Sequence, residues 1–191
     1  FLIPRMIPSW SASEDAWITL KFYKSFLNLL DPDLLALADN HEFAFILTLF
    51  DMEREGIAIN REKMQNLILK NDAKIKALTA EIYELTGENF NINSVKQLGS
   101  VLFEHLKLPV KKKTKTGYST DEAVLAELIE EHPVIPKLLE YRELYKLQST
   151  YCEPLLSLAK KDANSRIYTN FIQTGTSTGR LSSKNPNLQN I

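Results

Sequence analysis

Two stretches of the chain repeat their apolar residues with the spacing expected of helices that pair along a seam. In residues 61–86, alternating steps of four and three join Met64, Ile68, Asn71, Ile75, Leu78, Ile82 and Leu85. Further along the chain, the same alternation joins Val134, Leu138, Tyr141, Tyr145, Gln148, Cys152 and Leu155. A repeat of this kind predicts two long helices that pack against each other.

The two seams also predict how the helices align. If the helices run antiparallel with Met64 opposite Leu155, then Asn71 falls opposite Gln148. Two polar residues at one level of the seam would fix the register at some cost in stability. The alternative, that both amides face solvent through a skipped contact, is equally open. Pro154 is expected to end or kink the second helix near its last turns, because it lacks a backbone N–H group.

The two ends of the chain carry shorter patterns. Helical spacing over residues 13–30 and 34–55 predicts two further helices with apolar faces. Gly56 is expected to cap the second of them, and residues 57–60 to lead in an extended conformation into the next helix. Residues 166–173 predict a strand, and residues 174–190 a polar surface loop. The two apolar faces consist of Leu20, Tyr23 and Leu27, and of Phe43, Ile46, Leu47 and Phe50.

The insert between the two long helices carries two sequences typical of helix starts. Residues 94–97 and 119–122 both have the capping-box pattern, in which a serine precedes Gln or Glu by three positions. A helix N-terminus presents free N–H groups to a phosphate. The alternative, that each box is an ordinary cap, is favoured for either box alone. Together with the lysine-rich loop before the second box, however, the boxes predict an arm that grips a phosphate backbone.

Net charge hides an uneven distribution of charge. The chain carries -1 overall, yet residues 91–120 contain six lysines against one acidic residue, Glu104. Residues 160–191 contain five basic residues against Asp162, and the rest of the chain is acidic or balanced. Two basic islands on an acidic body favour a polyanionic partner. Taken alone, a run such as 111–113 is most often a solvated loop.

Composition excludes several classes of protein. The 191 residues are 44% hydrophobic and 25% charged, as in globular proteins rather than disordered ones. The single cysteine, Cys152, cannot form an internal disulfide and is expected in the core, which fits a reducing compartment. No apolar run approaches the ~20 residues of a membrane span, so we expect no membrane partner and a cytoplasmic protein. Because the chain begins at Phe1 rather than at a methionine, we expect it to be an excised fragment of a longer parent.

The C-terminal loop carries a specific resemblance. Thr178-Gly179-Arg180-Leu181-Ser182-Ser183 and Pro186-Asn187-Leu188-Gln189-Asn190-Ile191 resemble the signature that opens the palm of family A DNA polymerases. Residues 90–98, 113–120 and 141–151 resemble the thumb of the same family, in the same order. The similarity is strong over residues 42–191 and weak over residues 9–41.

The resemblance implies a layout. Residues 1–41 would be the C-terminal helices of a 3′–5′ exonuclease-like domain, residues 42–163 the thumb, and residues 164–191 the start of a truncated palm. The fold class would be mainly α. It would comprise N-terminal helices, a long antiparallel helix pair with a small helical basic tip, and a short C-terminal β/loop segment.

The resemblance also implies which residues bind DNA. Arg180 matches an arginine that lies in the minor groove near the primer terminus, where hydrogen-bond acceptors occur in every correct pair. Arg142 and Lys146, four apart on one helical face, match thumb residues that contact the backbone; ion pairs with Glu140 or Glu143 are the alternative. The expected DNA-binding residues are Lys96, Lys111, Lys112, Lys113, Lys115, Thr116, Ser119, Arg142, Lys146, Arg180, Asn187, Gln189 and Asn190.

Catalytic groups are expected elsewhere in the parent. In this family two metal ions held by palm aspartates promote polymerisation. Those aspartates would follow Ile191, so Mg²⁺ and dNTP would bind the parent alone. No metal ion and no catalytic residue are therefore expected in this chain. Asp15 aligns with the last metal-binding aspartate of the exonuclease. Ser11 stands where active exonucleases have a tyrosine, which implies a degenerate exonuclease domain. The favoured alternative is that Asp15 has no metal-binding role and is an acidic residue near a helix N-terminus that offsets the helix dipole.

The leading hypothesis is a polymerase fragment that binds primer–template duplex DNA without sequence preference. Its parent, expected to be bacterial and nucleoid-associated, would transfer deoxynucleotides to a primer 3′ end in replication and repair, whereas the fragment alone would be inactive. The alternative is a helical protein-interaction module that binds no nucleic acid. A nuclease built around Asp15 is disfavoured, because one carboxylate cannot hold two metals. We also expect the truncated palm to expose apolar surface at residues 166–172, which could produce an artificial dimer.

Overall fold

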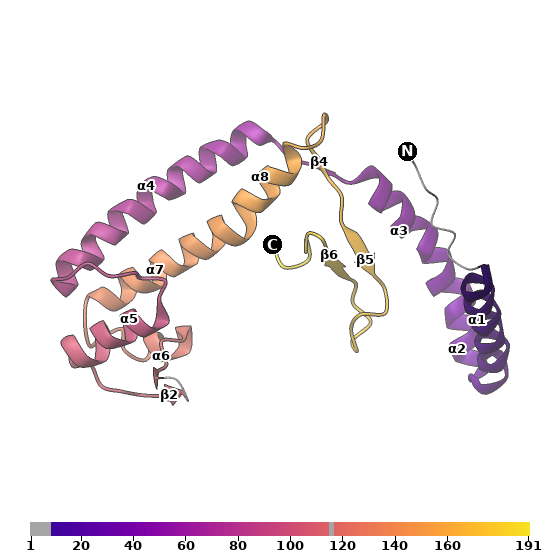
Figure 1. Cartoon of the computed structure of the whole chain (residues 1–191), viewed down its shortest axis with the longest axis horizontal. Coiled ribbons are helices and arrows are strands. Elements are labelled where there is room, and N and C mark those ends of the chain that lie inside the picture. The colour runs from indigo at the N-terminus through magenta and orange to yellow at the C-terminus, as the bar shows by residue number, and fades with distance from the viewer. Residues whose placement is uncertain (1–8, 115–116) are drawn as a thin grey trace. The chain divides into compact units, whose positions relative to one another are not determined.

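A computed structural model describes residues 9–114 and 117–191 of the chain (Figure 1). Their contacts form two compact units, with the boundary between Glu55 and Gly56. The domain boundary predicted at 41/42 therefore falls inside the first unit, and the one predicted at 163/164 falls inside the second. Residues on both sides of the second boundary pack together, because Leu155 and Ala159 share an apolar cluster with Ile167.

The described residues of the first unit are helical except at Leu30 and Asp31, which connect its first two helices. Asp31 caps α2 by accepting a hydrogen bond from the Asp33 N–H at 2.8 Å, and Pro32 occupies the first turn, where its missing N–H group is tolerated. The predicted apolar faces are present but remain exposed, and Leu49 is the buried residue among those described. The helices of this unit are α1 (Ser9–Leu29), α2 (Pro32–Leu37), the π-helical segment η1 (Ala38–Glu42) and α3 (Phe43–Glu55).

The long helix pair forms the frame of the second unit (Figure 1). Asn60 caps the first helix by accepting a hydrogen bond from the Lys63 N–H at 2.9 Å, and Gly87 ends it in a left-handed conformation with φ 75°. The second helix continues through a π-helical segment into a final α-helical segment of seven residues. The pair consists of α4 (Arg61–Thr86) on one side, and of α7 (Val134–Lys146), η3 (Leu147–Cys152) and α8 (Glu153–Ala159) on the other.

Three polar contacts define the register of the pair. The Arg61 guanidinium donates to the Ala159 carbonyl at 2.8 Å, near the start of α4 and the end of α8. Midway, Gln148 Nε2 donates to Asp72 Oδ1 at 2.6 Å. Near the other end, Lys137 Nζ lies 2.6 Å from Glu81 Oε2. The helices are therefore antiparallel, and Gln148 lies at the level of Asn71 and Asp72, as the seams predict.

Burial follows the predicted seams except at one position. Asn71 and Gln148 are both buried, so the alternative in which they face solvent is wrong. Tyr145 is 41% exposed, with its ring stacked on Tyr141 at 5.7 Å, and Leu144 packs against the core. Tyr145 lies in α7, before the π-helical segment η3, and the seam positions that follow, Gln148, Cys152 and Leu155, are buried as predicted.

Pro154 does not end the second helix. It lies in the first turn of α8, directly after η3. Proline removes an N–H group and its ring crowds the carbonyl four residues earlier. The change to π-helical hydrogen bonding in η3 accommodates this loss, and the chain remains helical up to Ala159.

The insert folds as a small tip on the far end of the pair (Figure 1). Ser94 caps α5 by accepting a hydrogen bond from Gln97 N–H at 3.4 Å, whereas the Gln97 side chain accepts from Asn91 N–H at 2.7 Å. The elements of the tip are α5 (Val95–Ser100), the π-helical segment η2 (Val101–His105), β2 (Lys113–Thr114), β3 (Gly117–Tyr118) and α6 (Glu122–Ala126). Strands β2 and β3 pair antiparallel.

The second predicted capping box is wrong. The N-cap of α6 is Asp121, and its side chain makes no capping bond. Ser119 and Thr120 are buried instead, and Ser119 Oγ donates to Asp121 Oδ2 at 2.7 Å. These two residues extend the chain from β3 into the core. Ser119 therefore lies two residues before the N-cap position and cannot cap the helix.

The main core lies where the tip packs on the helix pair. Helices α4 and α7 contribute one side of it, and α5, η2 and α6 contribute the other. Its fully buried members are Ile82, Leu98, Leu102, Leu125, Leu128, Val134, Ile135 and Leu138. Burial of these side chains holds the basic tip as one body with the end of the pair.

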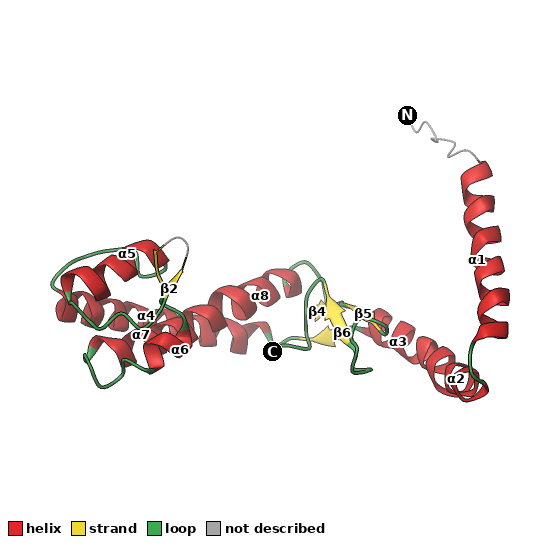
Figure 2. Cartoon of the chain, turned by 90° about the horizontal axis from the view of Figure 1, so that it is seen from below, coloured by secondary structure: helices red, strands yellow, loops and turns green. Residues whose placement is uncertain are grey.

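The C-terminal segment joins the opposite end of the pair (Figure 2). Its predicted strand is divided into β4 (Arg166–Ile167), which pairs antiparallel with β1 (Ile57–Ala58), and β5 (Asn170–Ile172). Strand β5 pairs with β6 (Ser182–Lys184), so the predicted polar loop contains a strand that sequence analysis missed. A second apolar cluster contains Leu155, Ala159 and Ile167, with Ile59, Tyr151, Leu158 and Leu188 packed against it.

Candidate nucleic-acid interface

The tip brings together most of the lysines expected to bind DNA. Lys111, Lys112 and Lys113 lead into β2 with exposed side chains. Lys112 is tied to the next strand, because its carbonyl accepts a hydrogen bond from Ser119 N–H at 3.1 Å. Lys113 Nζ lies 5.7 Å from the centroid of the Tyr118 ring, within cation–π range. We call Lys111–Lys113 with strands β2 and β3 the lysine hairpin; Lys115 and Thr116 lie outside the described residues.

Lys96 lines a groove beside the lysine hairpin. The groove has a volume of about 450 Å³ and runs between α5 and β3. Gly99 permits this close approach, since a Cβ atom at this position would lie 3.3 Å from the Tyr118 Cβ. The lining residues are Val95, Lys96, Gly99, Ser100, Glu104, Gly117 and Tyr118.

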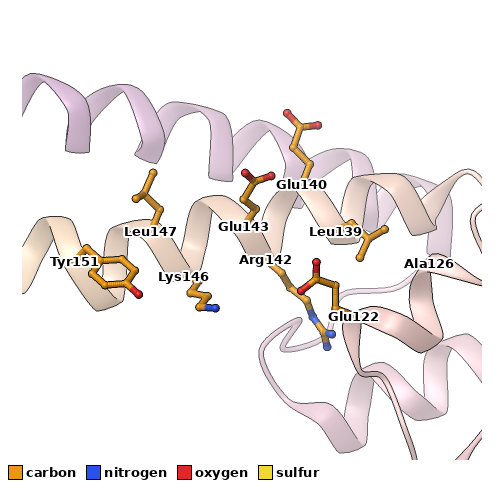
Figure 3. A pocket seen from close by; sticks show the side chains of 9 residues that line it. All are labelled: Glu122, Ala126, Leu139, Glu140, Arg142, Glu143, Lys146, Leu147 and Tyr151. Carbon is orange, nitrogen blue, oxygen red and sulfur yellow. The ribbon is translucent and has the colours of Figure 1, made fainter. Parts of the chain in front are cut away.

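A second groove of about 650 Å³ runs along α7 and η3 beside α6 (Figure 3). Lys146 is exposed in it, and within the described part of the chain no ion pair joins Lys146 to Glu140 or Glu143. Its nine lining residues are Glu122, Ala126, Leu139, Glu140, Arg142, Glu143, Lys146, Leu147 and Tyr151. An exposed ammonium group in a groove can meet a phosphate oxygen without first losing another partner.

Arg142 behaves differently from Lys146. Its guanidinium donates to the carbonyl oxygen of Thr120 and, at 3.0 Å, to the Thr120 hydroxyl. The side chain is half-buried, and this loss of solvent lowers the pKa of Arg142, while Asp121 nearby acts in the opposite direction. The alternative expectation of an ion pair with Glu140 or Glu143 is therefore wrong, because Thr120 takes the guanidinium.

The palm-like residues lie around the β5–β6 hairpin. Arg180 is exposed in the turn before β6, where its carbonyl accepts a hydrogen bond from Thr176 Oγ1 at 2.7 Å. Asn187 Oδ1 accepts from Gln189 N–H at 3.0 Å, which shapes the turn after β6. The side chains of Gln189 and Asn190 are exposed. Figure 1 shows this hairpin and the tip at opposite ends of the helix pair, both on the side of α7 and α8.

Three further residues shape the interface and were not predicted. Tyr118 supports Lys113, Thr120 holds Arg142, and Tyr151 lines the second groove. The signal for Tyr118 was its position just after a lysine-rich run. Thr120 carried no signal in the sequence, because its partner lies 22 residues away.

The described residues contain no evident metal centre. Asp15 lies on α1, exposed, and its backbone carbonyl accepts a hydrogen bond from Thr19 Oγ1 at 2.7 Å. No group of three or more His, Cys, Asp or Glu residues in the described part of the chain could hold a metal ion. Among the same residues, no helix has the length and apolarity that a membrane span requires.

Comparison with known proteins decides the family. The profile described as "DNA polymerase family A" matches residues 61–191, which include the helix pair, the tip and the β5–β6 hairpin. The chain belongs to DNA polymerase family A. Members of this family are generally metal-dependent. The fold class predicted from the sequence, mainly α with a thumb-like helix pair, is confirmed.

Similar proteins agree with this assignment. DNA polymerase I of Caldicellulosiruptor bescii is 46% identical over 172 residues, which are 90% of this chain and 20% of that protein. DNA polymerase I of Treponema pallidum is 45% identical over 181 residues, 94% of this chain and 18% of that protein. The chain thus spans about a fifth of the length of these family A relatives. A solved structure, the POL domain of Pol1 from M. smegmatis in complex with DNA primer-template and dNTP, matches with a TM-score of 0.74 and 40% identity, covering 83% of this chain and 28% of that one.

Proposed function

We propose that this chain is the thumb-containing part of a DNA polymerase I and that it binds primer–template duplex DNA without sequence preference. The observation that carries the proposal is the set of exposed lysines on the tip of a family A helix pair, at Lys96 and Lys111–Lys113. Lysines bind phosphates as point charges and read no sequence. The solved relative was complexed with DNA primer-template and dNTP, which supports the same class of partner here.

The proposed domain roles follow the predicted boundaries. Residues 1–41 would close an exonuclease-like domain, residues 42–163 form the thumb, and residues 164–191 begin the palm. In this arrangement the thumb grips the duplex backbone through its tip. Arg180 would lie in the minor groove near the primer terminus, with Asn187, Gln189 and Asn190 close by.

Polymerisation itself is proposed for the parent protein. The parent would be a nucleotidyltransferase that adds dNTPs to a primer 3′ end in replication and repair, in the cytoplasm and at the nucleoid. Its Mg²⁺ ions would be held by palm aspartates outside this sequence, as the resemblance to the family implies. Residues of this chain would bind and orient the duplex, and no chemical step is assigned to them.

The helical protein-interaction module is not favoured as an alternative. Membership of family A accounts for both the helix pair and the basic tip, and no observation on the described residues calls for a protein partner. The predicted artificial dimer also lacks a specific observation in its favour. Of the residues expected to be exposed in the truncated palm, Ile167 is buried and Tyr168 is 45% exposed.

Fluorescence anisotropy of a labelled primer–template duplex tests the proposed DNA binding. We expect the chain to bind several unrelated duplex sequences with similar affinity. Replacing Lys111, Lys112 and Lys113 by alanine should weaken binding more than tenfold, since each would remove a phosphate contact. A matched control replaces the exposed Lys70, Lys74 and Lys76 of α4, which changes the net charge equally but away from the tip. Equal effects of the two triple variants would contradict the proposal.

A further inference from the structure

Arg142 lies in the groove on α7 but is already engaged. Figure 3 shows its side chain extending from α7 on the side that faces α6. The guanidinium donates two hydrogen bonds to one residue, at the carbonyl and the hydroxyl of Thr120. Thr120 is only 2% exposed, so these bonds are shielded from water. An arginine with two fixed donors on a buried partner is suited to hold that partner in place.

Thr120 connects directly to the lysine hairpin. The preceding residue, Ser119, is also buried, and its N–H donates to the Lys112 carbonyl at 3.1 Å. On the other side, Ser119 Oγ donates to Asp121 Oδ2 at 2.7 Å, which fixes the start of α6. Arg142 is therefore linked to the backbone of the lysine hairpin by its hydrogen bonds to Thr120, by the peptide bond between Thr120 and Ser119, and by the Ser119 N–H bond to the Lys112 carbonyl.

We propose that Arg142 is a positioning residue that anchors the lysine hairpin to α7, and that it serves DNA binding through the hairpin rather than by contacting phosphate itself. The proposal rests on the proposed DNA binding and assigns Arg142 a different role from Lys146. Lys146 lies one helical turn further along the same face, is exposed, and contacts none of Ser119, Thr120 or the hairpin through a hydrogen bond within the described residues. Lys146 would meet phosphate directly.

A double-mutant cycle separates the two roles. The affinity of residues 1–191 for a primer–template duplex is measured for R142Q and for K146Q, each with the native lysines and with Lys111, Lys112 and Lys113 replaced by alanine. We expect R142Q to weaken binding about tenfold in the native background, as for loss of a charged hydrogen bond. In the alanine background the loss should fall below about twofold, because residues that act through one another are not additive. K146Q should reduce the affinity by the same factor in both backgrounds. If R142Q also reduced the affinity by the same factor in both backgrounds, the proposal would be overturned.

Arg142→Lys tests whether charge alone accounts for the effect. Lysine keeps the positive charge but cannot donate two bonds in the fixed geometry of a guanidinium. We expect R142K to bind DNA as weakly as R142Q, and binding equal to the native chain would overturn the proposal. If R142Q fails to fold, Thr120→Val removes only the 3.0 Å hydroxyl bond and should show a smaller loss with the same dependence on the lysines.

Hydrogen exchange tests the anchor without DNA. The Ser119 N–H that bonds to Lys112 should exchange at least several-fold faster in R142Q and at the native rate in K146Q. An unchanged rate in R142Q would overturn the anchoring role even if DNA binds normally. Conversely, a chain that binds no DNA but shows the faster exchange would refute the proposed function while supporting the anchor.

Discussion

Leu78 and Leu69 lie on the same helix, α4, and differ mainly in burial. Leu78 is 5% exposed in the main core, whereas Leu69 is 67% exposed. We expect Leu78→Ala to lower the free energy of unfolding by about 2–5 kcal/mol, because it removes buried methyl groups and leaves a cavity. The matched control Leu69→Ala should change it by no more than about 0.5 kcal/mol. Urea denaturation followed by circular dichroism measures both, and similar losses would contradict the assigned face of α4.

Asp162 makes the stability of the second unit depend on pH. Its carboxylate accepts hydrogen bonds from Arg166 N–H at 2.9 Å and from Asn164 N–H at 2.8 Å, and from the Tyr168 hydroxyl at 3.3 Å. These bonds, that from Arg166 foremost, hold the pKa of Asp162 below its ordinary value of 3.8. A lowered folded-state pKa stabilises the fold above pH 3.8, and this contribution disappears as the pH falls through the folded-state pKa.

Asp162→Asn tests this pH dependence. The variant should be less stable than the native chain at pH 7, and the difference should shrink as the pH falls below about 3.8. Denaturation curves at a series of pH values measure it. A difference that stays constant across this range would show that the charge of Asp162 plays no part.

At the scale of single residues, the sequence alone predicted which face of a helix is buried better than it predicted hydrogen-bond partners. The seam residues Asn71 and Gln148 were placed at one level by their spacing, and both are buried there. The sequence could not show that Gln148 bonds to Asp72, or that Arg142 bonds to Thr120. Such pairs depend on how two distant segments meet, which no local periodicity records.

Gly56, the residue that follows α3, occupies a position where a side chain would be strained. It has φ 64°, and a Cβ atom here would lie 2.7 Å from the Ile167 carbonyl oxygen and 2.8 Å from the Tyr168 ring. Gly87 is a matched control, because it has φ 75° but no atom within 4 Å of a built Cβ. Gly87→Ala should cost about 1 kcal/mol of left-handed strain. Gly56→Ala should cost about 1–3 kcal/mol more; thermal unfolding of both variants measures this, and equal costs would contradict the close packing of β4 on Gly56.

At the scale of elements, long periodic helices were predictable and short strands were not. Helix α4 was predicted from residue 61 to 86 and spans Arg61–Thr86. Strand β6 was missed because its three residues, Ser182–Lys184, are polar and show no alternation. The second capping box failed for a similar reason: Ser119 is drawn into the core by its neighbours, and a motif of four residues cannot report burial.

At the scale of the whole molecule, charge position matters more than total charge. The chain has a formal charge of -1, yet its lysine hairpin and Lys96 form one basic surface on the tip. The first unit presents a different property, since its apolar faces are exposed within that unit. The sequence predicted the basic tip from its composition, but the two grooves beside it required the folded arrangement of α5, α6 and α7.

The most direct test of the proposed DNA binding is the salt dependence of the affinity for a primer–template duplex. The logarithm of the binding constant should fall linearly with the logarithm of the salt concentration. Replacing Lys111, Lys112 and Lys113 by alanine should reduce the slope by about 0.9 for each lysine that contacts a phosphate, whereas replacing Lys70, Lys74 and Lys76 should leave it unchanged. A slope that is the same for the native chain and the hairpin variant would contradict phosphate binding by the tip.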